Sequence, residues 1–142
     1  MIIRPEQPAD YEAIAQVVQA AFGRENEARL VELLRAPETY IPELALVAEE
    51  DGVVVGHIMT TYVTLEGAST RRVLSLAPLA VVPERQKDGI GGVLMRESIA
   101  RAAGARGEGV LSHRGGAGDE GGAGMARRRV RRPDRQRDRR AT

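Results

Sequence analysis

The chain has 142 residues with a formal net charge of +1, 42% hydrophobic residues, one Phe, no Trp and no Cys. This length indicates a single domain, and the apolar content allows a core of aliphatic side chains. The composition excludes disulfides, thiolate metal sites and a cysteine nucleophile, and it argues against base stacking on aromatic rings.

The same composition limits other partners. Two histidines, His57 and His113, leave little for zinc, so we expect no metal. Residues 1–6 lack an apolar signal core, and no apolar run approaches the length of a membrane span. We therefore expect a cytoplasmic protein with no membrane partner.

The N-terminal part predicts one strand followed by two helices. Residues 2–5 form the expected strand, and a helix opens at residues 8–10. Its apolar residues, spaced three to four apart, are Tyr11, Ile14, Val18 and Phe22. A second helix over residues 26–35 ends before Pro37, and its expected apolar side consists of Leu30, Leu33 and Leu34.

The middle of the chain predicts an antiparallel meander. Residues 44–49 and 53–59 flank an Asp-Gly pair, which is a strong hairpin signal. The second strand continues to about residue 63, and a further strand covers residues 73–82. Pro78 interrupts this last strand and removes a ladder hydrogen bond, which favours a bulge or a splayed edge; the alternative is a simple strand break.

A glycine-rich loop follows directly, in the sequence Arg85-Gln86-Lys87-Asp88-Gly89-Ile90-Gly91-Gly92. A helix begins at Ile90 and ends near Gly104, with one apolar side that consists of Leu94, Met95, Ile99 and Ala102. Two glycines separated by one residue bring backbone N–H groups close to an anion, and the helix dipole adds to the attraction. The loop therefore suits a pyrophosphate, although an ordinary strand-to-helix turn is the alternative. Neither the dinucleotide G-x-G-x-x-G pattern nor the P-loop pattern is present.

Gln86, Gly89 and Gly91 match Gln/Arg-x-x-Gly-x-Gly/Ala, the acetyl-CoA signature of the GNAT acetyltransferase superfamily, and residues 76–84 resemble that family's central strand and its exit. The resemblance covers residues 1–106 and implies an α/β fold with a mixed (α+β) sheet, the GNAT acyl-CoA N-acyltransferase fold. It also implies acetyl-CoA as co-substrate. The backbone of Leu79, Ala80 and Val81 would bind the pantetheine arm, and the phosphates would meet Gln86, Lys87, Asp88, Gly89, Ile90 and Gly91.

The activity implied by the resemblance is transfer of acetyl from acetyl-CoA to an amine of an unknown small molecule or protein. The catalytic residues are left open. The family's usual acid is a tyrosine in a later region, where this chain has no match, since its tyrosines are at 11, 40 and 62. Candidate bases are Glu25, Glu27 and Glu84, each of which also fits a solvated surface carboxylate. We interpret His57 as a satisfied core or edge residue.

The composition changes after Arg106. Residues 1–106 carry 11 basic and 15 acidic residues, whereas residues 107–142, the basic tail, carry 10 arginines and 5 acidic residues. Residues 109–112 form the tail's short apolar run, and we expect no folded structure beyond them. One interpretation is a disordered Arg/Gly-rich arm that binds phosphate backbones. The other, which we favour, is a shifted reading frame downstream of about Arg106. Resequencing the codons for residues 103–112 would test this second interpretation.

Two further functions remain open from the sequence. Besides an active acetyltransferase, the chain could be an inactive truncated relative of the family. It could also be a nucleic-acid binder that acts through its basic tail. Loss of the family's fifth strand would expose the edge of the strand at residues 73–82, which predicts a homodimer or aggregation.

Overall fold

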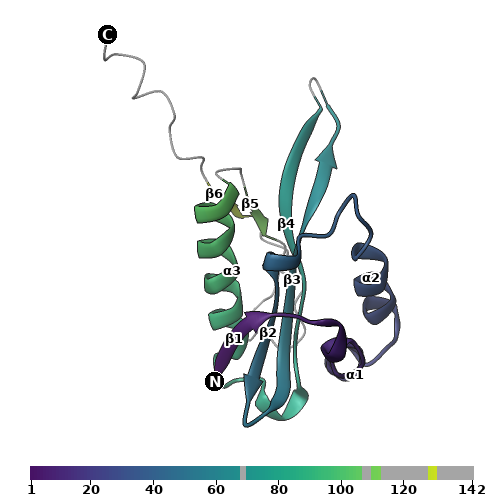
Figure 1. Ribbon diagram of the computed structural model, residues 1–142, viewed down its shortest axis with the longest axis vertical. Coiled ribbons are helices and arrows are strands. Elements are labelled where there is room, and N and C mark those ends of the chain that lie inside the picture. Colours follow the sequence, from purple (N-terminus) through teal and green to yellow (C-terminus); the bar gives the residue numbers. More distant parts are fainter. Residues whose placement is uncertain (68–69, 107–109, 113–127, 131–142) are drawn as a thin grey trace, which may run out of the picture.

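The computed structural model describes residues 1–67, 70–106, 110–112 and 128–130. In these residues, one mixed sheet lies between helices that cover both of its faces (Figure 1). The strand order follows the chain, with strands β1 (Ile2–Pro5), β2 (Ala45–Glu50), β3 (Val53–Leu65), β4 (Arg71–Val81), β5 (Val110–Ser112) and β6 (Arg128–Val130). The mixed α/β fold class predicted from the sequence is confirmed.

All neighbouring strands are antiparallel except β4 and β5, which are parallel. Asp51 and Gly52 form the turn between β2 and β3, with φ of 51° and 78°. Two consecutive positive φ angles match the right-handed twist of the flanking strands. The predicted Asp-Gly hairpin is therefore confirmed, and it places the end of β2 beside the start of β3.

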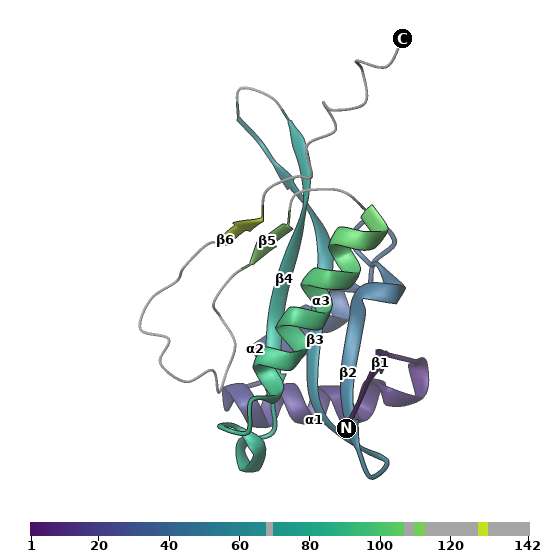
Figure 2. The ribbon, with the colours of Figure 1, turned by 90° about the vertical axis from the view of Figure 1, so that its left-hand side faces the viewer.

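Helices α1 (Tyr11–Phe22) and α2 (Asn26–Leu34) lie on one face of the sheet, and α3 (Ile90–Arg106) lies on the other (Figures 1 and 2). Short 3₁₀ turns at Pro8–Asp10, Pro42–Leu44 and Pro83–Arg85 connect these elements, each with a proline in its first turn. Proline fits there because the first N–H groups of a helix have no intrahelical acceptor.

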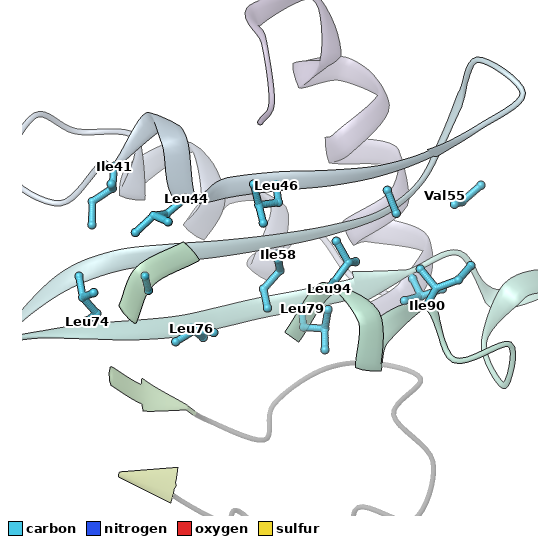
Figure 3. Packing of buried hydrophobic residues seen from close by; sticks show 13 residues of the cluster. Ile41, Leu44, Leu46, Val55, Ile58, Leu74, Leu76, Leu79, Ile90 and Leu94 are labelled. Atoms are coloured by element: carbon cyan, nitrogen blue, oxygen red, sulfur yellow. The ribbon is translucent and has the colours of Figure 1, made fainter. Parts of the chain in front are cut away.

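The core has two parts, one on each face of the sheet. Between α3 and the sheet, aliphatic side chains interdigitate (Figure 3), and the labelled residues of this cluster are Ile41, Leu44, Leu46, Val55, Ile58, Leu74, Leu76, Leu79, Ile90 and Leu94. The cluster under α1 and α2 includes Ile14, Val17, Val18, Val31, Met59 and Ala80. Because strand side chains alternate between faces, Leu79 and Ala80 contribute to opposite clusters.

Helix α2 packs through a different side from the one predicted. Val31 is buried with 2% exposure, whereas Leu30 and Leu33 are 43% and 73% exposed. Ala28 and Leu34 pack beside Val31 at helical spacing, so the contact stripe passes through these three residues. The predicted leucine side is wrong except for Leu34, because leucines on two sides of a short helix do not show which side meets the sheet.

The structure also differs from the prediction beyond α3. The helix ends at Arg106 rather than near Gly104. Strand β5 pairs with Leu74–Leu76 of β4, so part of the edge expected to be exposed is covered. The expectation of no folded structure beyond residue 112 is wrong at β6, which pairs with β5. Other residues of the basic tail, His113 among them, lie outside the described residues, and the predicted domain boundary after residue 106 stays a prediction.

Candidate functional site

Strand β4 contains an irregularity at the position of Pro78. Leu79 is opposite Ile58 of β3 and Leu76 is opposite Thr60, so that two residues of β4, Ala77 and Pro78, face a single residue of β3. This geometry is that of a β-bulge. The prediction of a bulge at Pro78 is confirmed, and the alternative of a strand break is wrong because β4 continues to Val81.

Beyond the bulge, the two sides of β4 differ. Residues 79–81 pair with β3 on one side. On the other side, the described residues of β5 pair only with Leu74–Leu76, before the bulge. The bulge therefore divides β4 into two parts. Before it, Leu74–Leu76 pair with both β3 and β5; after it, residues 79–81 pair with β3 alone among the described strands.

The glycine-rich loop joins the end of β4 to α3. Lys87 and Gly89 both have positive φ, 87° and 82°, a conformation that glycine adopts without strain. The first helical bond of α3 runs from Val93 N to Gly89 O (3.1 Å). Because the N–H groups of a first helical turn have no intrahelical acceptor, Ile90, Gly91 and Gly92 present such groups at the end of β4. The loop thus has the backbone that an anion cradle requires.

Side chains of the loop contact the protein itself. The Gln86 amide donates to the carbonyl of Val81 (3.0 Å), which fastens the start of the loop to the end of β4. Arg85 donates through Nε to Asp88 (2.6 Å) and through Nη1 to Glu50 at the end of β2. The predicted residues 79–81 and 86–91 therefore lie on one continuous segment, which consists of the end of β4, the glycine-rich loop and the start of α3.

The three predicted bases are dispersed. Glu25 and Glu27 lie at the start of α2, where they pair with Arg29 (2.9 Å) and Arg24 (3.0 Å) as surface ion pairs do. Glu84 lines an open cavity of about 530 Å³ between α1 and the β2–β3 turn. Other charged residues of this cavity are Arg4, Asp10 and Glu49, which pair with one another through the Arg4 guanidinium.

A buried charged network under α1 and α2 escaped the sequence analysis. Glu6, whose side chain is fully buried, accepts from Arg35 Nε (2.8 Å) and the Tyr40 hydroxyl (2.9 Å), and lies 2.7 Å from His57 Nε2. Arg35 also stacks 3.7 Å from the centroid of the Tyr11 ring. The four residues around Glu6 come from α1, the end of α2, the following loop and β3, so the network ties the helices to the sheet.

The network changes the acidity of its members. Burial acts to raise the pKa of Glu6, but the hydrogen bonds from His57 and Arg35 outweigh it and lower that pKa to about 2. Burial, with the nearby Glu6 charge, raises the pKa of Tyr40. The interpretation of His57 as a satisfied core residue is confirmed at Nε2, while its Nδ1 is buried and has no partner among the described residues. His57 is opposite Ala80 of β4.

The described residues contain neither a candidate metal site nor a candidate membrane span. No group of three or more His, Cys, Asp or Glu side chains there could hold a metal ion. No described helix is long and apolar enough to cross a membrane.

A family model described as an acetyltransferase (GNAT) domain matches residues 2–111. The chain therefore belongs to the GNAT acetyltransferase family, as the resemblance of its loop predicted. The matched region includes β4, the loop, α3 and the first residues of β5.

Individual relatives agree with this assignment. The chain is 42% identical over 92 residues to the uncharacterized N-acetyltransferase YjhQ of Escherichia coli K12, covering 64% of this chain and 51% of that protein. A GNAT acetyltransferase from Brucella melitensis, solved in complex with acetyl-CoA, is 40% identical with a TM-score of 0.70, covering 78% of this chain and 73% of that one. E. coli YhbS, solved in complex with CoA, is 26% identical with a TM-score of 0.68, covering 78% of this chain and 61% of that one.

Proposed function

We propose that this protein is an N-acetyltransferase that transfers acetyl from acetyl-CoA to a primary or secondary amine. The chain spans about half the length of its curated relative YjhQ, so the activity rests on the part that the two share. The observation that carries the proposal is the bulge at residues 77–78, which is followed by the glycine loop at residues 85–92 and by the start of α3 at Ile90. Two relatives with acetyl-CoA or CoA bound support it.

The cofactor half of the site consists of two backbone surfaces. The backbone of Leu79, Ala80 and Val81 would accept the pantetheine arm as an additional strand would, through main-chain hydrogen bonds. The N–H groups of residues 86–91 would hold the diphosphate at the positive end of the α3 dipole. Gly91 supports this assignment. A Cβ at this position would lie 3.6 Å from Leu79 and 3.8 Å from Val81, which is ordinary van der Waals contact, so the packing of the chain does not require a glycine there. The close approach of a ligand to the backbone would require one.

The reaction needs one bond formed and one broken. The neutral amine attacks the acetyl carbonyl carbon, a C–N bond forms, the C–S bond breaks, and the proton lost by the amine balances the one taken up by the departing thiolate. Holding both reactants in the cleft supplies a large part of the rate. We assign no general base or acid, because Glu25 and Glu27 are engaged in surface ion pairs and Glu84 lines the open cavity between α1 and the β2–β3 turn.

We also propose a cytoplasmic location and self-association. The cytoplasmic location is supported by the composition without cysteine, which is compatible with a reducing compartment. Self-association is supported by the limited cover of β4, where the described part of β5 pairs with three residues, and by Leu65 at the hairpin end, which is 44% exposed.

The proposal is tested first by binding. A ligand present at 100 times its dissociation constant stabilises a protein by about 2.7 kcal/mol, which for this size corresponds to several degrees in Tm. Thermal melts with and without saturating acetyl-CoA should show that shift, and Gly89→Glu should abolish it, because a carboxylate and a strained backbone enter the cradle. Gly67→Glu is the control for the added charge, since its position in the β3–β4 turn has open space around it.

Turnover is tested next with a panel of amines and a thiol-release assay. Release of CoA thiol that depends on both acetyl-CoA and one class of amine would establish the activity. No thermal shift in the wild-type chain, or a shift that Gly89→Glu retains, would refute the assignment of the cradle.

A further inference from the structure

The glycine loop contains a charge that conflicts with its proposed ligand. Asp88 lies between Lys87 and Gly89, in the turn that would hold a diphosphate. Aspartate favours turns because its side chain bonds to nearby backbone and it tolerates unusual φ angles, which gives a local reason for its presence. A carboxylate within a few ångströms of two phosphates nevertheless repels them.

Arg85 compensates this charge. Its Nε donates to Asp88 Oδ2 at 2.6 Å, while Nη1 donates to Glu50, which ends β2 on the neighbouring hairpin. The backbone closes the same turn, since Asp88 N donates to Arg85 O (3.3 Å). Asp88 first, and then Glu50, raise the pKa of Arg85, so its guanidinium stays charged.

The exposure of these groups separates a binding role from a role in stability. The side chains of Arg85, Asp88 and Glu50 are 35%, 50% and 33% exposed. Ion pairs at such exposure contribute little to folding stability. Their field at a neighbouring anion extends over a Debye length, which is roughly 8–10 Å at physiological ionic strength.

We propose that Arg85 is a positioning residue for the cofactor: it neutralises Asp88 and ties the diphosphate loop to the β2–β3 hairpin, without itself contacting a phosphate. This inference rests on the proposed acetyl-CoA site. It differs from the simpler view that a basic residue beside the cradle pairs directly with the ligand. Nε and Nη1 of Arg85 already donate hydrogen bonds to the carboxylates of Asp88 and Glu50.

The test is a double-mutant cycle on Arg85 and Asp88, measured by calorimetric titration with three probes. CoA has the diphosphate and the 3′-phosphate, dephospho-CoA has the diphosphate alone, and pantetheine has neither. Arg85→Gln should weaken CoA and dephospho-CoA equally, by about tenfold or about 1.4 kcal/mol of binding free energy, and leave pantetheine unchanged. Adding Asp88→Asn to Arg85→Gln should restore most of the loss, because the repelling charge is then gone.

Arg29→Gln is the matched control, because it removes the same charge from a surface ion pair on α2 and should not alter CoA binding. A melt of each variant keeps the result interpretable, since Arg85→Gln should change Tm by no more than the control does. If Arg85→Gln is unstable, the double variant Arg85→Gln/Asp88→Asn, which leaves the net charge of the loop unchanged, is compared with Asp88→Asn alone.

Three results would overturn the inference while leaving the cofactor site standing. These are unchanged CoA binding by Arg85→Gln, a loss that Asp88→Asn does not rescue, and a loss confined to CoA, which would assign Arg85 to the 3′-phosphate. If the wild-type chain binds neither CoA nor dephospho-CoA, the proposed function fails and this inference fails with it.

Discussion

The buried network around Glu6 allows a quantitative prediction about Glu6→Gln. Glutamine keeps the size of the side chain and a hydrogen-bonding amide but removes the charge that Arg35 and His57 contact. The Arg35 side chain is only 13% exposed, so it would lose its counterion in a poorly solvated place. Breaking a buried pair by removing one partner typically costs about 3–5 kcal/mol.

The pKa of Glu6 gives a second route to the magnitude. The network lowers it from 4.5 to about 2, and at about 1.4 kcal/mol per unit this difference corresponds to roughly 3 kcal/mol of stability. The two routes agree. The loss is a large part of the 5–15 kcal/mol typical of a domain, and it should lower Tm by about 10 °C or more.

The sign of the pH dependence follows from the direction of the shift. Glu6 binds its proton less tightly in the folded state, so its contribution is fully present above about pH 4.5 and is lost as the pH falls through about 2. Denaturant unfolding at pH 7, 4, 3 and 2 should therefore show a gap between the wild type and Glu6→Gln that narrows with falling pH. Comparing the two proteins cancels the titration of the other carboxylates.

Glu12→Gln is the control for this experiment, because Glu12 is exposed on α1. Its unfolding free energy should stay within about 0.5 kcal/mol of the wild type. A Glu6→Gln protein as stable as this control at pH 7, or a gap that does not change between pH 5 and 2, would refute the reasoning.

Three further predictions concern packing and are measured by denaturant unfolding. Gly56→Ala places a Cβ 3.0 Å from Leu94 and 3.2 Å from Ile90, so it should lower the free energy of unfolding by about 1–3 kcal/mol. Because it displaces the start of α3, it should also weaken CoA binding. Unchanged CoA binding would contradict this coupling. Leu94→Ala should cost about 2–5 kcal/mol, and a cost under 1 would argue against the core under α3. Val31→Ser should destabilise the protein and Leu33→Ser should not; the reverse order would restore the leucine side predicted from the sequence.

The bulge and the glycine loop could be predicted because their signals are local. Proline at 78 cannot donate to a ladder, and Gly89 occupies a positive φ that other residues adopt with strain. Each constraint acts within a few residues of its cause. The family's motif falls on the same segment, so the sequence could predict the local structure of the strand, loop and helix start that are proposed to hold the cofactor.

Non-local features were not accessible in the same way. Glu6 meets Arg35 and His57 at separations of 29 and 51 residues, and before folding nothing distinguishes it from a surface glutamate. Strands β5 and β6 have three residues each, too few for a period of two to be visible. The side of α2 that meets the sheet was likewise set by its partners rather than by its own leucines.

The distribution of the site along the chain has a consequence for function. Every residue proposed to hold acetyl-CoA lies between positions 79 and 91, and the ion pair between Arg85 and Glu50 that holds this segment also lies within the first 106 residues. Changes to the basic tail should therefore affect the acceptor side and catalysis before they affect the cofactor. A chain that binds acetyl-CoA at the cradle but acetylates no amine would be an inactive relative, whereas binding and turnover together would show that the chain is an active enzyme with its basic tail present.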